Sequence, residues 1–380
     1  MLYSEWLRQQ GVDDAHIIHI DLEDRRNKAL RDPDNLLAYI DGKMVDDSMY
    51  YIMVDEIQHV VEFEDVLNSY LKIMNADVYV TGSNARFLSK DVITTFRGRG
   101  DEIKVYPLCF REFMTAFDGT KERGLDEYLI YGGMPQTLEY TNATKKTEYL
   151  KAMFTNTYIR DIKERYNIRN DELMDNLLDV ISSSIGSLTN PTKLANTLQS
   201  VRHENVGNKI VSTYLEYICD SFLAERVSRY DVKGKSYFDT PYKYYFVDMG
   251  LRNARLNFRQ SEPTHMMENI IYNELRVRGY NVDVGIVPVV VRDASGKQVR
   301  SQLEIDFVCN FGSKKYYIQS AYRMPDEEKI RQEEASLRKV DDSFKKIVII
   351  GEDIVVRHNE AGITTLGIYD FLLNPNSLEF

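Results

Sequence analysis

The sequence predicts an α/β protein whose N-terminal part is built on a parallel β-sheet. Three runs rich in apolar residues, at 16–24, 50–57 and 76–84, each end in acidic or small polar residues, and helical patterns separate them. Continuous apolar runs are typical of strands that are buried on both faces. Strands that alternate with helices form parallel sheets with helices on both sides.

The other N-terminal elements follow from apolar periodicity and from turn residues. In the segment 63–74, Val66, Leu67, Leu71 and Met74 recur at helical spacing. The first 115 residues are expected to contain, in order, a helix ending at Gly11, a strand at 16–24, a helix at 35–44, a strand at 50–57, a helix at 63–74 and strands at 76–84 and 101–108.

The rest of the chain divides into three further regions. Residues 116–180 are expected to form a helical connector. Residues 181–260 have the pattern of a winged helix, with two helices followed by two strands around a turn at Gly234. Residues 261–380 return to α/β, with a helix, three strands joined by short turns, a charged helix and another strand.

Composition narrows the class of protein. The net charge of −11 argues against nonspecific binding of polyanions, although a local basic face is compatible with it. Three widely spaced cysteines without a C-x-x-C pair suit reduced thiols, so we expect a cytoplasmic location. The six histidines lack the spacing of transition-metal ligands, and no apolar run is long enough to cross a bilayer.

The carboxylates Asp55 and Glu56 follow the apolar run "YYIMV" directly. At such a strand end in a nucleotide hydrolase, the first acid holds Mg²⁺ and the second activates water. Thr81 and Asn84 follow the next strand, where a polar side chain can reach a phosphate or the water. Arg97 and Arg99 lie on a glycine-flanked loop, as a charge-stabilising arginine would. The alternative is an acidic loop after a buried strand.

The ordered motifs "DEIQ", "TGSNARFLS", "RGRGDEIKVYPLCFREF" and "YLIYGGMPQ" resemble the AAA-superfamily ATP-binding proteins of bacteria and archaea. Those proteins carry a C-terminal winged helix and a restriction-endonuclease-like region, and the match continues through "YFVDMGLRNA", "MENIIYNEL" and "EIDFV". The resemblance implies ATP and Mg²⁺ as cofactors, Asp55 and Thr81 as cofactor-binding residues, with Asp55 on the metal, and Glu56 and Asn84 as catalytic residues. It also implies a homo-oligomer in which Arg99, in preference to Arg97, serves as the charge-stabilising arginine at the ATP site of a neighbouring subunit.

The chain departs from this family in one respect. The phosphate-binding loop G-x-x-x-x-G-K-[ST] is absent from residues 1–380, and Gly234-Lys235-Ser236 is no substitute because Arg229 stands where the first glycine should be. The expected fold is therefore a truncated P-loop AAA-type parallel sheet (1–115), the helical connector and winged helix, and a C-terminal α/β restriction-endonuclease-like domain.

Two hypotheses remain open. The chain is a shortened ATPase with weak or no hydrolysis, or a non-catalytic regulator that binds DNA or a protein partner through its winged helix. Lys193, Lys209 and Lys235 are the candidate nucleic-acid contacts. The nuclease-like region is expected to be inactive, because its metal set of Glu268, Asp306 and Gln319 replaces an acid with a neutral amide, and Ala321 stands where a lysine is needed.

Overall fold

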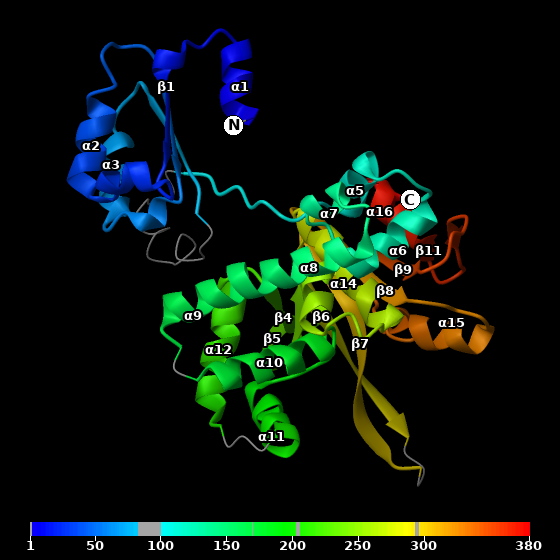
Figure 1. Cartoon of the computed structure of the whole chain (residues 1–380). Coiled ribbons are helices and arrows are strands. Elements are labelled where there is room, and N and C mark those ends of the chain that lie inside the picture. Colours follow the sequence, from blue (N-terminus) through cyan, green and yellow to red (C-terminus); the bar gives the residue numbers. More distant parts are fainter. Residues whose placement is uncertain (1, 83–99, 169, 203–205, 293–295) are drawn as a thin grey trace. The chain divides into compact units, whose positions relative to one another are not determined.

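The computed structural model describes residues 2–82, 100–168, 170–202, 206–292 and 296–380 (Figure 1). These residues form two compact units, Met1–Lys104 and Val105–Phe380. The expected AAA-type region ends at residue 115, which lies inside the second unit. The other expected boundaries, after residues 180 and 260, lie inside the second unit as well.

The first unit is built on a three-stranded parallel sheet in the order β1-β2-β3, as the apolar runs predicted. Its strands are β1 (Ile17–Asp21), β2 (Tyr50–Asp55) and β3 (Ala76–Val80), and its helices are α1 (Leu2–Gln9), α2 (Pro33–Asp41) and α3 (Phe63–Tyr70). Ile52 and Val54 of β2 are buried in one core with apolar residues of α2 and α3. On the other face, Ser4 of α1 donates to the sulfur of Met53.

The prediction of a strand at residues 101–108 is wrong. Residues 101–106 have no regular secondary structure, and Ile103 and Val105 are 83% and 88% exposed. The segment has the alternating apolar residues of a strand. However, a strand exists only where its backbone pairs with another, and no described strand lies beside this segment.

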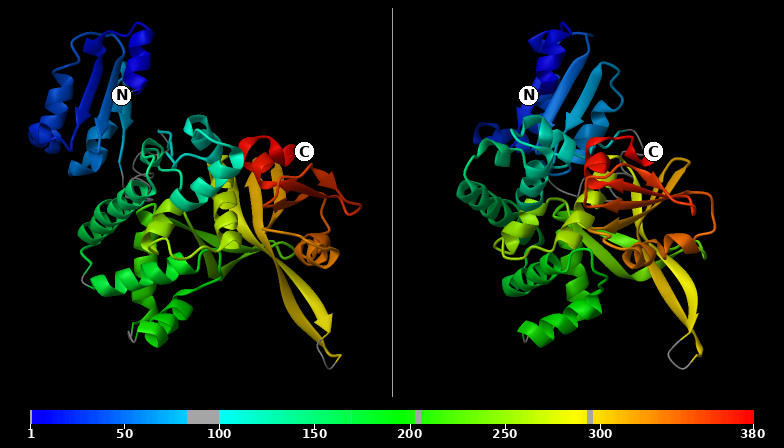
Figure 2. Two further views of the ribbon diagram at one scale, coloured as in Figure 1. Left: turned by 45° about the vertical axis from the view of Figure 1, so that its right-hand side comes forward. Right: turned by 90° about the vertical axis from the view of Figure 1, so that its right-hand side faces the viewer.

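The second unit contains an eight-stranded mixed sheet in the order β10-β11-β9-β8-β7-β6-β4-β5. Its strands are β4 (Ala224–Asp231), β5 (Ser236–Phe246), β6 (Asn281–Arg292), β7 (Gln298–Phe311), β8 (Lys314–Ala321), β9 (Lys345–Ile350), β10 (Arg357–His358) and β11 (Ile363–Gly367). The antiparallel hairpin β4–β5 was expected as a wing, and it does form. It also pairs through β4 with β6, so it belongs to the same sheet as the C-terminal strands. The β6–β7 hairpin projects well beyond the rest of this sheet (Figure 2).

Helices surround this sheet and form the connector. They are α5 (Phe110–Ala116), α6 (Lys121–Tyr131), α7 (Gln136–Glu139), α8 (Ala143–Ala152), α9 (Arg160–Tyr166), α10 (Asp171–Ser183), α11 (Pro191–Arg202), α12 (Asn208–Asp220), α13 (Met249–Arg255), α14 (Pro263–Val277), α15 (Glu327–Glu334) and α16 (Ile368–Leu373). A π-helical segment, Met153–Ile159, joins α8 to α9. The apolar residues of α14 are buried in the same core as those of β5 to β8, which places α14 on the sheet.

Two of the sequence motifs meet at Asp248. Its carboxylate accepts hydrogen bonds from the backbone N–H of Gly133 at 2.6 Å and of Leu251 at 3.0 Å. Burial raises the pKa of Asp248 to about 6, against the effect of these donors. Gly133 has to be glycine, because a Cβ there would collide with the carbonyl oxygen of Leu108. The motifs "YLIYGGMPQ" and "YFVDMGLRNA" thus hold the connector to the sheet.

Candidate functional site

The carboxyl ends of the N-terminal strands bring acidic residues together. Asp21 at the end of β1 is the register partner of Asp55 at the end of β2, because the strands are parallel. Immediately after Asp55, the backbone of Glu56 takes a left-handed conformation with φ of 55°. A non-glycine residue in this conformation is strained, and such strain is concentrated at functional sites. A short 3₁₀ turn, Ile57–His59, follows.

Thr81 links the ends of β2 and β3. Its hydroxyl donates to the Oδ1 of Asp55, and the N–H of Glu56 donates to the same hydroxyl oxygen at 3.2 Å. Both residues after β2 are therefore positioned by one side chain from the neighbouring strand. The predicted grouping of Asp55, Glu56 and Thr81 is present in the structure, whereas Asn84, Arg97 and Arg99 lie outside the described residues.

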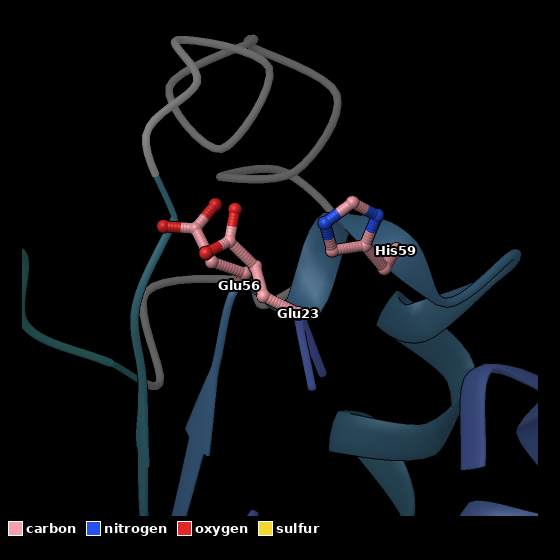
Figure 3. A group of neighbouring side chains, drawn as sticks. All are labelled: Glu23, Glu56 and His59. Carbon is pink, nitrogen blue, oxygen red and sulfur yellow. The ribbon is translucent and has the colours of Figure 1, made fainter. Parts of the chain in front are cut away.

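Glu56 also takes part in a group that the sequence analysis missed. Ligand atoms of Glu23, Glu56 and His59 all lie within 4.8 Å of one another (Figure 3). Two carboxylates and an imidazole can hold a divalent cation, and a nitrogen ligand favours a transition metal over Mg²⁺. Glu23 follows β1 as Glu56 follows β2, so the strand-end rule could have found it. His59 was passed over because it has no second histidine at ligand spacing.

A second acidic cluster lies in the larger unit, around Lys243 of β5. The Nζ of Lys243 is 2.8 Å from Glu268 of α14, and 2.7 and 3.5 Å from Glu304 and Asp306 of β7. Lys243, Glu268 and Asp306 are 3%, 6% and 7% exposed. Tyr245 donates to Glu268 at 2.6 Å, and the N–H of Ser320 donates to Asp306 at 2.9 Å. One ammonium group thus lies among three carboxylates.

Burial and charge shift the pKa values of this cluster in opposite directions. Burial, reinforced by the charge of Glu268, raises the pKa of Asp306 to about 7. Burial also acts to raise the pKa of Glu268, but the ammonium of Lys243, the imidazole of His265 at 3.8 Å and the hydrogen bond from Tyr245 bring it below the ordinary value. The cluster therefore holds a proton on Asp306 more readily than on Glu268.

Only two of the three predicted nuclease residues lie together in the structure. Glu268 and Asp306 meet at Lys243, but Gln319 forms its hydrogen bond with Ser336, at 3.5 Å. Lys243 was not predicted, because "TPYKYYFVD" was interpreted as a wing. The alternation of strand residues gives the missing signal, since Lys243 and Tyr245 must share a face and Tyr245 is in an apolar stretch.

The three predicted nucleic-acid contacts are exposed. Lys193 lies on α11, Lys209 near the start of α12, and Lys235 in the turn between β4 and β5. Arg229 of β4 adds little positive charge to this surface, because it is only 8% exposed and donates to Gln302 inside the unit.

Comparison with known proteins finds two family models that each match part of the chain. Residues 1–114 match the AAA domain family, and residues 122–262 match a domain of unknown function, DUF8612. An uncharacterized protein of Haemophilus influenzae is 31% identical over 379 residues, which cover 98% of this chain and 90% of that protein. The chain belongs to the same family as this protein. The family has a more distant relative in Methanocaldococcus jannaschii, the uncharacterized protein MJ1544, which is 27% identical over 368 residues, 93% of this chain and 78% of the relative.

Solved structures also match, including the following two. Protein VC1899 from Vibrio cholerae gives a TM-score of 0.24 at 15% identity, over 97% of this chain and 98% of that one. Cdc6p from Pyrobaculum aerophilum gives 0.26 at 10% identity, over 71% and 83%. None of the helices in the described residues is long and apolar enough to span a membrane.

Proposed function

We propose that this protein binds ATP with Mg²⁺ at the carboxyl edge of its N-terminal sheet, and hydrolyses it weakly or not at all through residues 1–380 alone. The observation that carries the proposal is the position of Thr81, whose hydroxyl holds both Asp55 and the backbone of Glu56. Ligands of parallel sheets bind beyond the carboxyl ends of the strands. The match of residues 1–114 to the AAA domain family supports the same site.

The oxygen atoms at this edge suit Mg²⁺, which prefers carboxylates and water. Asp55 would hold the metal, Glu56 would orient the attacking water, and Thr81 would position both acids and contact the nucleotide. Asn84 would sense the terminal phosphate, and Arg99 would stabilise negative charge in a neighbouring copy, which implies a homo-oligomer. Bound Mg²⁺ would supply charge neutralisation at the phosphates.

The experiment is equilibrium binding of a fluorescent ATP analogue to the full chain, with and without Mg²⁺. Asp55→Asn should weaken binding in Mg²⁺ at least about tenfold, the loss expected for one charged contact. Asp47→Asn is the matched control, because Asp47 is exposed in the loop before β2. Glu56→Gln should retain binding and remove any residual hydrolysis. Absence of Mg²⁺-dependent binding by the unmodified chain would contradict the proposal.

A second candidate function is binding of DNA by a regulator without nuclease activity. Two observations favour it. Lys193, Lys209 and Lys235 are exposed, and the ammonium of Lys243 already lies where three carboxylates could otherwise hold a metal. Duplex DNA binding should weaken with added salt, because phosphate contacts release counterions.

Fluorescence anisotropy at two salt concentrations tests this candidate. Replacing all three lysines by glutamine should weaken binding and flatten its salt dependence. Lys72→Gln, an exposed change in the N-terminal unit, is the control. Equal anisotropy at both salt concentrations would contradict DNA binding. The regulator would then be expected to bind a protein partner instead.

A further inference from the structure

The second unit contains a cavity of about 550 Å³ between α10, α11 and the turn that follows α13. All of its lining residues lie between Asp179 and Gln260, inside the segment that matches DUF8612. The volume is within the range of small-molecule sites. The cavity shares no lining residue with the acidic edge of the N-terminal sheet or with the Lys243 cluster.

A buried arginine fixes the walls of this cavity. Arg252 is completely buried, and its Nε donates to the carbonyl of Ser182 at the end of α10 at 2.8 Å. Its Nη1 donates to the carbonyl of Gln260 in the opposite wall at 3.1 Å. A buried guanidinium is costly unless its donors are satisfied, so both walls are held in place by the same group. The cavity is therefore formed before any ligand enters.

The backbone of the turn after α13 is strained, and this turn places Arg259 in the lining of the cavity. Asn257 and Phe258 are consecutive residues with φ of 52° and 56°, in the left-handed region that side chains disfavour. The ring of Phe258 packs against Tyr131, with ring centroids 6.0 Å apart, which holds the turn. Arg259 follows directly and lines the cavity. Strained backbone of this kind persists where the surroundings fix it, often at ligand sites.

Two of the three cations in the lining have no acidic partner in the part of the chain that is described. Arg255 is neutralised, since it pairs with Asp179 at 2.7 Å and with Asp175 at 3.0 Å. Among the described residues, the ammonium of Lys193 donates to the carbonyl of Leu188 at 3.0 Å and to no carboxylate. Arg259 is exposed and makes no salt bridge to a described residue. The cavity therefore carries uncompensated positive charge.

Hydroxyl groups make up much of the remaining polar lining. Ser183 and Ser184 both donate to the carbonyl of Val180, at 3.0 and 2.6 Å. Thr197 donates to the carbonyl of Lys193 at 2.9 Å. A hydroxyl whose proton is already donated retains only acceptor capacity. The lining thus combines cations for an anionic group with oxygen acceptors for hydroxyl or amine donors of a ligand.

We propose that this cavity binds a small phosphorylated ligand that also carries hydroxyl groups, such as a sugar phosphate or the sugar-phosphate part of a free nucleotide. Arg259 and Lys193 bind the phosphate, because a guanidinium forms short, paired hydrogen bonds with phosphate oxygens. The hydroxyls of Ser183, Ser184 and Thr197 accept from the sugar. This site is separate from the proposed ATP site and does not depend on it.

Isothermal titration of the full chain with ribose 5-phosphate, and with ribose as the uncharged probe, tests the site. Ribose 5-phosphate should bind, and Arg259→Gln should weaken it at least about tenfold, the loss expected for one charge-assisted hydrogen bond. Lys193→Gln should weaken it in the same direction. Arg300→Gln, an exposed change on β7, is the matched control and should leave binding unchanged.

Three results would overturn the proposal. One is equal binding of ribose and ribose 5-phosphate, because the cations would then have no role. Another is the absence of heat with ribose 5-phosphate at millimolar concentration in the folded protein. The third is that a short duplex DNA binds to the protein and ribose 5-phosphate does not, and that Arg259→Gln abolishes the binding of the DNA. That result would assign the cations to a nucleic-acid backbone and not to a small ligand.

Discussion

The ammonium of Lys243 lies 2.8 Å from the carboxylate of Glu268, and both side chains are almost completely buried. Lys243 belongs to β5 and Glu268 to α14, so this pair joins the β4–β5 hairpin to the helix on the sheet. Glu304 and Asp306 contact the same ammonium from β7. A single buried cation therefore holds three carboxylates together, of which Glu268 and Asp306 are buried and Glu304 is partly exposed.

Lys243→Met is expected to destabilise the second unit strongly. Removing one partner of a buried ion pair leaves the other uncompensated, which costs about 3–5 kcal/mol. Here three carboxylates would lose their cation. Urea unfolding followed by circular dichroism measures the loss. Lys233→Met, at an exposed position in the turn of the same hairpin, should be nearly neutral. Equal midpoints for the two variants would show that the cluster contributes nothing to stability.

Asp306→Asn is expected to change how stability depends on pH. The pKa of Asp306 is raised to about 7 in the folded protein, above the value of about 4 for an unfolded aspartate. The folded state thus retains a proton that the unfolded chain releases. This contribution to stability is complete below about pH 4 and is lost as pH rises through 7.

The amide introduced by Asp306→Asn stays neutral at every pH, so the variant should melt higher than the natural protein at pH 8. The gain should be roughly 2–4 °C for each kcal/mol recovered. The advantage should shrink as pH falls towards 4, where Asp306 is already protonated. Scanning calorimetry between these pH values is the measurement, with the exposed Asp341→Asn as control. A variant that is less stable than the natural protein at pH 8 would refute the assignment.

Gly133→Ala is expected to loosen the contact between the connector and α13. The added Cβ would collide with the backbone carbonyl of Leu108, which cannot rotate away as a side chain could. Overpacking of this kind costs about 1–3 kcal/mol. The displacement would also disturb the hydrogen bond from Gly133 to Asp248. Gly207→Ala is the control, because nothing lies within 4 Å of its Cβ position. Thermal unfolding should separate the two variants clearly.

Local patterns in the sequence predicted much of this fold. The three parallel strands of the first unit were found because short apolar runs such as the one around Ile52 and Val54 alternate with helical patterns. The two-sided burial that these runs suggested is only partial, because in β2 buried residues alternate with half-buried ones. The β6–β7–β8 meander was found from its short turns. Local information suffices where the pairing partner is the next element along the chain.

The pairing of strands that lie far apart in the chain could not be predicted from local sequence patterns. The segment 101–108 has the composition of a strand, but composition does not specify a partner, and Ile103 is exposed. The β4–β5 hairpin was recognised, yet its pairing with β6 was not, because two helices, α13 and α14, separate β5 from β6 in the sequence. The alternation of strand residues could have shown that Lys243 faces the core, but its carboxylate partners, which are far along the chain, were not predictable.

Thr81→Val is expected to weaken the end of the N-terminal sheet without affecting the second unit. Valine keeps the shape of threonine but removes the hydroxyl that binds Asp55 and the N–H of Glu56. Losing such hydrogen bonds at an exposed position should cost about 1 kcal/mol. Trp6, the single tryptophan of the chain, stacks on Tyr3 at 5.7 Å, and Tyr3 packs against Tyr79 of β3. Its fluorescence therefore reports the unfolding of this unit.

The urea midpoint seen by Trp6 fluorescence should fall in Thr81→Val. The transition of the larger unit, which dominates circular dichroism, should remain where it is, because the two units have separate apolar cores. Ser69→Ala is the control, since its hydroxyl donates to the carbonyl of Asp65 within α3 and takes no part in the strand-end contacts. An unchanged fluorescence midpoint, or an equal fall in Ser69→Ala, would mean that Thr81 does not hold the acidic edge in place.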